Sequence, residues 1–574
     1  MAKRTLRVAV EGCCHGMLDD IYRQLHIRET SSGEKIDLLI ICGDFQAIRN
    51  VTDLECMSCP DKYKQIGGFY RYYTGERVAP VPTIFVGGNH EASNHIRELY
   101  YGGWVAPNIY YLGNSGVIRF GGLRIGGISG IFKDFDYIKG YYERPPFRGH
   151  SRASMHHVRS FEVFKMLQIR KPLDVVVSHD WPQNIEKFGN VARLLRKKPF
   201  FEAESKRGEL GSPVNALLME RLRPAWWFSA HLHVRFEANL TPSDTIFDKG
   251  WNNVPPYNNP QNGANSVLAN AHAANSAEKF DNSSATVHGS GLNKDEIAID
   301  SFSEDESEPN PQGTTSTVSN RLPLNLPPPK YSIPDTSELV LEAAISDTKQ
   351  QNIPFEKASA AEVEDDPVDQ TVSSPQVSGR TTKFLALDKC LPRREFMEVI
   401  DIEVGDGYDP NIAHLQLEYD PEWLAILRLC NRYLPLEESS FILPSEVMAT
   451  LEYTKLPLFT DSMLDRELDW VNANIFADGP VFVPPNFMPM APTPPQGTPD
   501  YANFGLAARV YGQGGRGSRP HGRGRGRGGY NQSNTRDSIP WQGPRPDIVY
   551  PNPQVDEFCQ MVGLQDNLTQ RRHQ

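Results

Sequence analysis

The segment VAVEGCCHG (residues 8–16) decides how the first half of the chain is interpreted. An apolar, β-branched run typical of a strand ends at Gly12 and is followed by Cys13, Cys14 and His15. Side chains two positions apart lie on the same side of an extended backbone, so Cys13 and His15 can share one partner. Two interpretations remain open on this stretch alone: a buried thiol at the end of a strand, or a pair of metal ligands.

Apolar runs of strand length recur along the first 240 residues, and short helical stretches separate them. The runs are rich in β-branched and aromatic residues, as expected for strands that are buried on both faces of a sheet. Their alternation with helices predicts an α/β fold for this part of the chain. The five runs are residues 6–10, 36–42, 81–86, 173–177 and 225–230, and Gly121-Gly122 marks a hairpin between two further strands.

Potential metal ligands follow directly after each of the five runs. Open α/β sheets assemble their sites at the carboxyl ends of strands, so we expect these side chains to converge. One such residue beside a strand is commonly structural, whereas five groups in this order favour a metal centre. The donors are Cys13, His15, Asp44, Asn89, His179, His231 and His233. They exceed the four ligands of a tetrahedral site and predict two divalent ions, which Asp44 could bridge through its two oxygens.

The order of these motifs resembles that of the calcineurin-like metallophosphoesterases: Asp-x-His, Gly-Asp, Gly-Asn-His-Glu, a later His and Gly-His-x-His. The chain departs from this series at Cys13, where the family has Asp, and at Ala230, where it has Gly. Within that superfamily the chain is similar to the RNA lariat debranching enzymes. The motifs that carry this similarity are EGCCHG, CGDFQAIRN, GGNHEASNH, YGGWVAPNIYYLG, GGISGIFK, VSHDWP, FSAHLHV and TTKFLALDKCLPRREF.

The resemblance implies a four-layer α/β-β/α sandwich with a small C-terminal domain and long disordered segments. We expect the catalytic domain at residues 1–240 and the C-terminal domain at 381–470. A disordered acidic and polar insert is expected at 241–380, and a disordered Pro-rich and Arg/Gly-rich tail at 471–574. Segments of such composition bury too little apolar surface to offset the entropy lost on ordering.

The resemblance also implies roles for the site residues. His90 would protonate the departing 2′-oxygen or stabilise its charge, and Glu91 would support His90 or the turn. A thiolate at Cys13 is a softer ligand than a carboxylate and favours Zn²⁺ or Fe²⁺ over Mg²⁺. The sequence leaves open which of Fe²⁺, Zn²⁺ and Mn²⁺ occupies each position. One ion would be held by Cys13, His15, Asp44 and His233, and the other by Asp44, Asn89, His179 and His231.

The resemblance places a lariat-recognition loop at about residues 129–159. Aromatic residues alternate there with Lys and Arg, so rings could stack on splayed bases while the cations contact phosphates. An ordinary amphipathic surface loop is the alternative interpretation. The residues expected to bind RNA are Lys133, Tyr137, Lys139, Tyr141 and Arg144.

Together these features predict hydrolysis of the 2′–5′ phosphodiester at the branch point of excised intron lariat RNA. This reaction linearises the RNA for turnover after pre-mRNA splicing, which implies a nuclear location. The alternatives are another phosphoester substrate, such as a phosphoprotein or a general nuclease substrate, and a non-catalytic RNA-binding scaffold. We expect a monomer. The Arg/Gly-rich segment at 514–529 is expected either to bind further RNA or to act as a linker.

Composition excludes several other classes of protein. The eight Cys in 574 residues are too scattered for a disulfide framework. No run of about 18 apolar residues suits a membrane span, and the first residues lack the apolar run of a signal peptide. We therefore expect a soluble protein of a reducing compartment with no membrane partner. The first 240 residues carry more basic than acidic side chains, which suits a polyanionic substrate.

Overall fold

The computed structural model describes residues 5–247, 254, 372, 379–404, 415–493 and 549–565. Most of the predicted insert at 241–380 and all of the Arg/Gly-rich segment at 514–529 lie outside these ranges. Among the helices within the described ranges, none has both the length and the apolar character needed to cross a membrane.

The first sheet has six strands in the order β12-β1-β2-β3-β5-β4. Its centre is parallel, from β1 through β2 and β3 to β5, and the edge strands β12 and β4 run antiparallel to their neighbours. The central strands are buried runs of the kind expected for a sheet covered on both faces. The bounds are β1 Thr5–Glu11, β2 Leu38–Ile41, β3 Thr83–Phe85, β4 Gly103–Ala106, β5 Ile109–Tyr111 and β12 Met397–Glu403.

The second sheet has seven strands in the order β10-β11-β9-β8-β7-β6-β13. Strands β7, β8, β9 and β11 are parallel, and the predicted hairpin at Gly121-Gly122 joins β6 to β7. The bounds are β6 Ser115–Phe120, β7 Leu123–Ile128, β8 Val175–Ser178, β9 Trp226–Ser229, β10 Phe236–Leu240, β11 Thr382–Ala386 and β13 Leu417–Tyr419.

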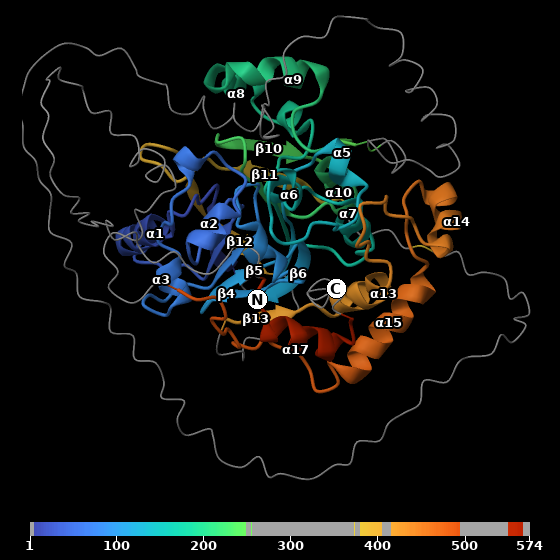
Figure 1. Cartoon of the computed structure of the whole chain (residues 1–574). Coiled ribbons are helices and arrows are strands. Elements are labelled where there is room, and N and C mark those ends of the chain that lie inside the picture. The colour runs from blue at the N-terminus through green and yellow to red at the C-terminus, as the bar shows by residue number, and fades with distance from the viewer. Residues whose placement is uncertain are drawn as a thin grey trace, which may run out of the picture. The chain divides into compact units, whose positions relative to one another are not determined.

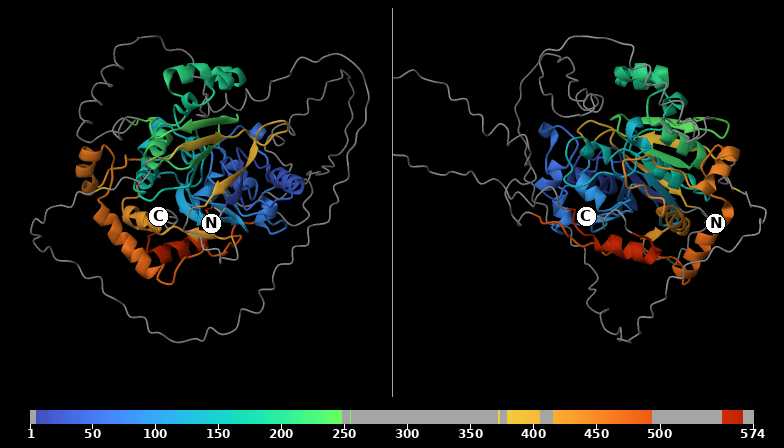
Figure 2. Two further views of the ribbon diagram at one scale, coloured as in Figure 1. Left: turned by 180° about the vertical axis from the view of Figure 1, so that it is seen from behind. Right: turned by 45° about the vertical axis from the view of Figure 1, so that its right-hand side comes forward.

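The two sheets share one continuous apolar core, and helices cover their outer sides (Figures 1 and 2). Their contact is close at Gly127 of β7, where a Cβ would lie 2.8 Å from Val86, the residue after β3. The predicted four-layer α/β-β/α class is thus confirmed. The larger helices of the first part are α1 Leu18–Ser32, α7 Ser160–Leu167, α8 Val191–Lys197, α9 Glu202–Arg207 and α10 Pro213–Leu222. The short ones are α2 Val51–Glu55, η1 Asp61–Tyr63, α3 Tyr70–Tyr73, α4 Ser93–Arg97, α5 Asp134–Tyr137, α6 His150–Ser154, η2 Ile185–Phe188 and η3 Pro199–Phe201.

The chain beyond the insert contributes strands to both sheets. β12 pairs with β1 along seven residues, β13 pairs with β6, and β11 lies inside the second sheet between β9 and β10. The alternation of runs within residues 1–240 did not indicate these pairings. The α/β core is therefore completed by residues that lie more than 130 positions after β10.

Four helices follow these strands within the described residues: α13 Pro421–Asn431, α14 Ser445–Thr454, α15 Asp461–Asn474 and α17 Pro553–Val562. The expected disorder from residue 471 onward is wrong for the described part of that segment, because α15 continues to Asn474 and α17 follows later. The composition of the tail obscured α17, whose Val555, Cys559 and Val562 recur at helical spacing and are buried. Burial of this face against the rest of the protein offsets the entropy lost on ordering.

Candidate metal centre

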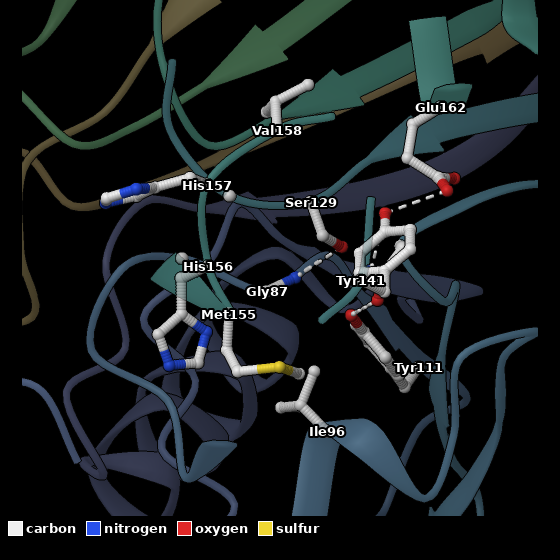
Figure 3. Close-up of a pocket in the computed structure, with 13 residues that line it drawn as sticks. Gly87, Ile96, Tyr111, Ser129, Tyr141, Met155, His156, His157, Val158 and Glu162 are labelled. Atoms are coloured by element: carbon white, nitrogen blue, oxygen red, sulfur yellow. Dashed lines mark hydrogen bonds between the residues drawn. The ribbon is translucent and has the colours of Figure 1, made fainter. Parts of the chain in front are cut away.

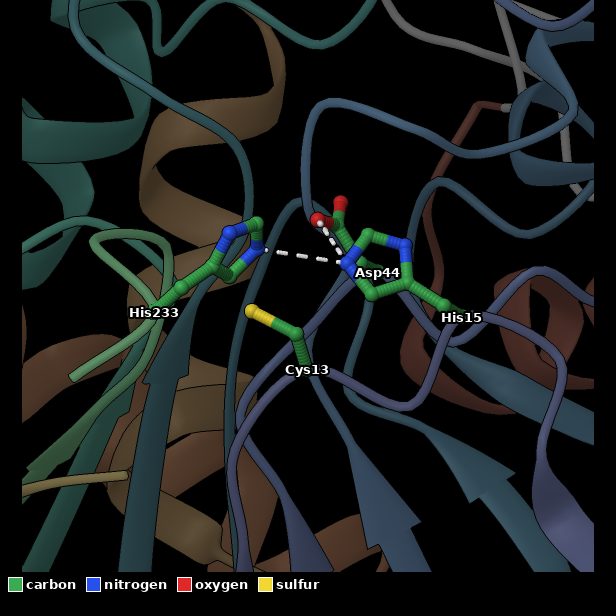
Figure 4. A group of neighbouring side chains, drawn as sticks. All are labelled: Cys13, His15, Asp44 and His233. Atoms are coloured by element: carbon green, nitrogen blue, oxygen red, sulfur yellow. Dashed lines mark hydrogen bonds and ion pairs between the residues drawn. The ribbon is translucent and has the colours of Figure 1, made fainter. Parts of the chain in front are cut away.

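Cys13, His15, Asp44 and His233 form one cluster, in which a ligand atom of each lies within 4.8 Å of the others (Figure 4). His15 Nε2 is 3.3 Å from His233 Nε2 and 3.7 Å from an Asp44 carboxylate oxygen. The residues come from the segments after β1, β2 and β9. Thiol, imidazole and carboxylate groups that point at one position are a donor set suited to a transition-metal ion.

The other three predicted ligands surround the same carboxylate. His179 Nε2 lies 3.4 Å from Asp44 Oδ2 and 3.2 Å from Asn89 Oδ1. The His231 ring is tilted against the His179 ring with centroids 5.0 Å apart, and its backbone N–H donates to Cys13 Sγ at 3.3 Å. The structure therefore brings all seven predicted donors together around Asp44. This arrangement fits two ions that share the Asp44 carboxylate.

The backbone holds these donors in an unusual conformation. His15, Asp44, His231 and His233 have φ between 45° and 58°, in the left-handed region that non-glycine residues rarely occupy. Each follows within four residues of a strand end, where the chain turns sharply. Strain of this kind is held by the surrounding fold and concentrates at functional sites.

Two glycines permit the close packing of the centre. A Cβ on Gly43, which has φ of 116°, would lie 2.2 Å from His179 Nδ1. A Cβ on Gly88 would lie 2.1 Å from Asp44 Oδ1. The absence of a side chain at both positions lets the ligand-bearing loops approach each other.

Burial sets the protonation of the donors. It lowers the pKa of His231 to about 3 and the pKa of His233 well below its usual range, so both imidazoles are neutral and able to bind a metal. Burial alone would raise the pKa of Asp44, but the charges of His179 and His90 hold it well below its usual range. Burial and the charge of Asp44 raise the pKa of Cys13, so thiolate formation there requires a cation.

Contacts around the ligands orient their rings, and the sequence did not reveal them. His179 Nδ1 donates to the Cys42 carbonyl at 2.8 Å, which fixes the ring with Nε2 facing Asp44. The Gln46 amide lies 3.3 Å from His15 Nδ1. Gln46 belongs to the GDFQ motif and has φ of 60°, but its position in the sequence carries no signal of a contact with His15.

His90 lies at the edge of the centre. Its backbone N–H donates to Asp44 Oδ1 at 3.0 Å, its Nε2 is 3.1 Å from the Asn89 amide, and its ring centroid is 5.9 Å from that of His15. Glu91 points away from His90 and accepts backbone N–H groups of Phe45, Gln46 and Gly88. Of the two predicted roles for Glu91, support of the turn is the one that these contacts match.

The loop at 129–159 differs from its prediction. Tyr137 and Tyr141 are 0% and 1% exposed, so their expected stacking on RNA bases is wrong for this structure. Tyr137 packs against Phe132, and the Tyr141 hydroxyl bonds Asn114 and Glu162. An alternation of aromatic and basic residues does not distinguish exposed rings from rings that tertiary contacts bury. Phe135 of the same loop is exposed, at 50%, and its ring lies against that of His150.

The three predicted cations of this loop have separate environments. Lys139 forms ion pairs with Asp136 and Glu438, and the Arg144 guanidinium donates to the carbonyls of Tyr141, Glu143 and Leu436. Both side chains thus tie the loop to other parts of the protein. Lys133 is half-buried, and its charge acts on His231 and Asp180, which places it beside the centre.

A cavity of about 10 Å³ lies between this loop and the segment that precedes Asn89 (Figure 3). Gly87, Tyr111, Ser129, Tyr141 and Glu162 are among the residues that line it, and Ser129 Oγ accepts the Gly87 N–H at 2.9 Å. A space of this size holds one water molecule at most, so it is too small to be a substrate pocket.

Comparisons with known proteins agree with this geometry. Residues 6–235 match the calcineurin-like phosphoesterase family, and residues 379–505 match the lariat debranching enzyme C-terminal domain. The chain is 38% identical over 487 residues to the lariat debranching enzyme of Schizosaccharomyces pombe, in an alignment that covers 85% of this chain and 90% of the relative.

Two animal relatives match over a smaller share of their length. Identity to the Gallus gallus lariat debranching enzyme is 37% over 472 residues, which are 82% of this chain and 62% of the relative. Identity to the Homo sapiens lariat debranching enzyme is 56% over 233 residues, which are 41% of this chain and 43% of the relative. The chain therefore spans less than two thirds of these relatives. The motif series, the fold and these similarities show that the chain belongs to the lariat debranching enzyme family.

Proposed function

We propose that this protein hydrolyses the 2′–5′ phosphodiester at the branch point of excised intron lariat RNA. The observation that carries the proposal is the convergence of seven donors from five strand ends around Asp44, with His90 beside them. This centre stands in a chain that belongs to the lariat debranching enzyme family. The product would be a linear RNA, ready for turnover after splicing.

The donor set implies two divalent cations, one near Cys13, His15 and His233 and one near Asn89, His179 and His231. When bound, such a pair activates water as a nucleophile and neutralises charge on the phosphate. Cys13 favours Zn²⁺ or Fe²⁺ at its position, with Mn²⁺ as a third candidate. The side chain of His15 is 23% exposed, whereas Cys13 and Asp44 are buried, so the substrate approaches from the side of His15.

His90 would supply the proton that the departing 2′-oxygen needs. Its ring lies at the edge of the centre, and the Asn89 amide and the backbone bond to Asp44 hold it in place. A positioned imidazole contributes about 10²–10⁴-fold to such a proton transfer. His90 therefore acts on the leaving group without being a metal ligand.

Selection of the 2′–5′ linkage has to come from positioning, because a metal pair does not distinguish phosphodiester linkages. The exposed Phe135 and the half-buried Lys133 of the loop at 129–159 would supply a ring and a cation for such positioning. Stacking on an aromatic ring contributes about 1–3 kcal/mol per base. The other four predicted loop residues would stabilise the conformation of this loop. They are Tyr137, Lys139, Tyr141 and Arg144.

The proposal also includes a nuclear location, a monomeric state and a role in RNA binding for the Arg/Gly-rich segment. The substrate implies a nuclear location, and one chain supplies every donor, so a monomer suffices. The Arg/Gly-rich segment at 514–529 would add RNA affinity without sequence preference.

The test compares three substrates with the metal-loaded full chain: a synthetic branched RNA, a linear RNA of the same sequence and a phosphopeptide. We expect cleavage of the 2′–5′ bond in the branched RNA and no comparable cleavage of the other two. Absence of cleavage by protein with a measured metal content of two would refute the proposal. Equal rates on the linear RNA or the phosphopeptide would instead favour a general nuclease or a phosphatase.

A further inference from the structure

We propose that a groove between α1 and residues 390–398 binds the phosphates of an RNA arm that leads away from the branch point. The inference rests on the proposed function and adds a path for the substrate outside the metal centre. The groove has a volume of about 700 Å³. Its basic residues are Arg23, Arg28, Arg235, Arg393 and Arg394, and its acidic residues are Asp20, Glu395 and Glu398.

The groove begins beside the metal centre. Met17, two residues after His15, forms part of its wall and is 38% exposed. On the opposite wall, the Cys390 backbone N–H donates to the Cys13 carbonyl at 3.1 Å. The segment that carries His15 therefore continues into one wall, and the other wall is hydrogen-bonded to the backbone of Cys13. His15 is also the exposed donor of its cluster, so a strand bound there can extend into the groove.

The arginines of the groove are not equally available. Arg235 is paired with Glu398 and Glu237, and Arg28 donates to the Met397 carbonyl at 3.1 Å. The Arg28 bond to Met397 holds α1 against β12, and the Arg235 pair with Glu398 holds the start of β10 against β12. Arg28 and Arg235 thus build the groove and have little capacity left for a ligand.

Arg393 and Arg23 are the cations that face a ligand. Arg393 is exposed and forms no ion pair with any residue that the structure describes. Its φ is 65°, so the LPRR turn holds it in a conformation that costs energy. Among the described residues, Arg23 is paired only with Asp20, one turn away on the same helix, and its side chain is 57% exposed. Exposed pairs of this kind are weak and exchange readily for a phosphate.

This pattern favours a polyanion over an apolar partner. The lining has five arginines against three carboxylates, so its net charge is positive although the whole chain is acidic. Guanidinium groups match phosphate oxygens in geometry and bind them without reading sequence. An arm of an intron has no fixed sequence, so backbone contacts are the recognition that such a substrate allows.

The test uses two branched RNAs, one with single-nucleotide arms and one with ten-nucleotide arms. The groove variant is Arg23→Gln with Arg393→Gln in the full chain. The control variant is Arg207→Gln with Arg466→Gln, two exposed arginines outside the groove lining. For the groove variant, we expect kcat/KM on long arms relative to short arms to fall about tenfold, through KM, and the salt slope of binding to drop by about 1.4. The control should leave both quantities at the wild-type values.

The outcomes separate this inference from the proposed function. An unchanged ratio and salt slope in the groove variant, beside active wild-type protein, would overturn the groove alone. If the wild-type protein cleaves neither substrate, the proposed function fails, and binding of a linear twelve-nucleotide RNA by the same variants still tests the groove. Loss of binding to a polyglutamate peptide without loss of RNA binding would show an acidic protein as the occupant and overturn the proposal.

Discussion

The side-chain amide of Gln554 pairs with both backbone groups of Trp104. Trp104 N–H donates to Gln554 Oε1 at 2.7 Å, and Gln554 Nε2 donates to the Trp104 carbonyl at 2.8 Å. Trp104 belongs to β4, the edge strand of the first sheet, and Gln554 belongs to α17. Gln554 thus forms hydrogen bonds with backbone groups at the edge of the first sheet, although that sheet begins at residue 5.

Replacement of this amide should destabilise the protein. Gln554→Ala leaves the N–H and C=O of Trp104 without their partner in a site where Gln554 is 8% exposed. We expect a loss of about 1–3 kcal/mol in the free energy of unfolding, measured by urea titration. Gln560→Ala, at an exposed position of the same helix, is the matched control and should change stability by less than about 0.5 kcal/mol. Equal stability of the two variants would show that α17 contributes nothing at this edge.

A pair of adjacent glycines allows a steric test of the metal centre. Gly88→Ala places a Cβ 2.1 Å from Asp44 Oδ1, so the Asp44 carboxylate has to move and metal binding should be lost. Gly87→Ala places its Cβ no closer than 3.5 Å to its neighbours and should retain metal. Elemental analysis of the two purified proteins measures the difference. Two ions per chain in Gly88→Ala would contradict the shared role of Asp44.

Ligand and proton-donor roles are separable by mutation. His15→Ala removes a donor of the Cys13 cluster and should lose metal together with activity. His90→Ala should keep its metal and lose about 10²–10⁴-fold in single-turnover rate on branched RNA. The two measurements are elemental analysis and rapid-quench kinetics. A His90→Ala protein without metal would show that His90 is a ligand and that the role given to it is wrong.

The buried pair of Arg124 and Asp420 predicts a dependence of stability on pH. Arg124 Nε donates to Asp420 at 2.8 Å, and Asp420 accepts the Trp423 N–H at the start of α13. Burial alone would raise the pKa of Asp420, but the charge of Arg124 holds it well below its usual range. The pair therefore stabilises the fold above the unfolded pKa of about 3.9, and this contribution is lost as the pH falls further.

Asp420→Asn isolates this effect. At pH 7 the variant leaves Arg124 without one of its buried partners, and we expect a loss of about 3–5 kcal/mol. The difference from wild type should shrink as the pH is lowered below about 4, because Asp420 of the unfolded wild-type chain then takes up a proton while folded Asp420 is still ionised. Thermal unfolding midpoints at pH 7 and pH 3 provide the measurement. A difference that is constant between the two pH values would refute the assignment.

The insertion of β11 predicts that the first part of the chain does not fold alone. Without residues 382–386, β9 and β10 lose the strand that lies between them. We expect residues 1–247 to be insoluble or unfolded when produced alone, and to form an active complex when produced together with residues 372–574. Circular dichroism and co-purification test this expectation. A folded, metal-binding 1–247 fragment would disprove it.

The residues of the metal centre were easier to predict from the sequence than the pairing of strands in the two sheets. The ligand motifs can be recognised in the sequence because each follows an apolar run and carries its ligand at a fixed position after that run. These motifs are Gly-Asp at 43–44, Gly-Asn-His at 88–90 and His-x-His at 231–233. The pairing of β12 with β1 joins residues almost 400 positions apart, and no local pattern records such a partner. The burial of Tyr137 and Tyr141 could not be predicted for the same reason. It depends on contacts with residues elsewhere in the chain, namely Phe132, Asn114 and Glu162.

The place of β11 also bears on when the protein can mature during synthesis. His231 and His233 lie on the connection between β9 and β10, and both of these strands are joined through β11. Ala386 is the last residue of β11, so it has to leave the ribosome before β9 and β10 can both pair with β11. The nascent chain consequently carries an unfinished sheet through the translation of the whole intervening segment. We therefore expect acquisition of metal to be a late event, completed after Ala386 has left the ribosome.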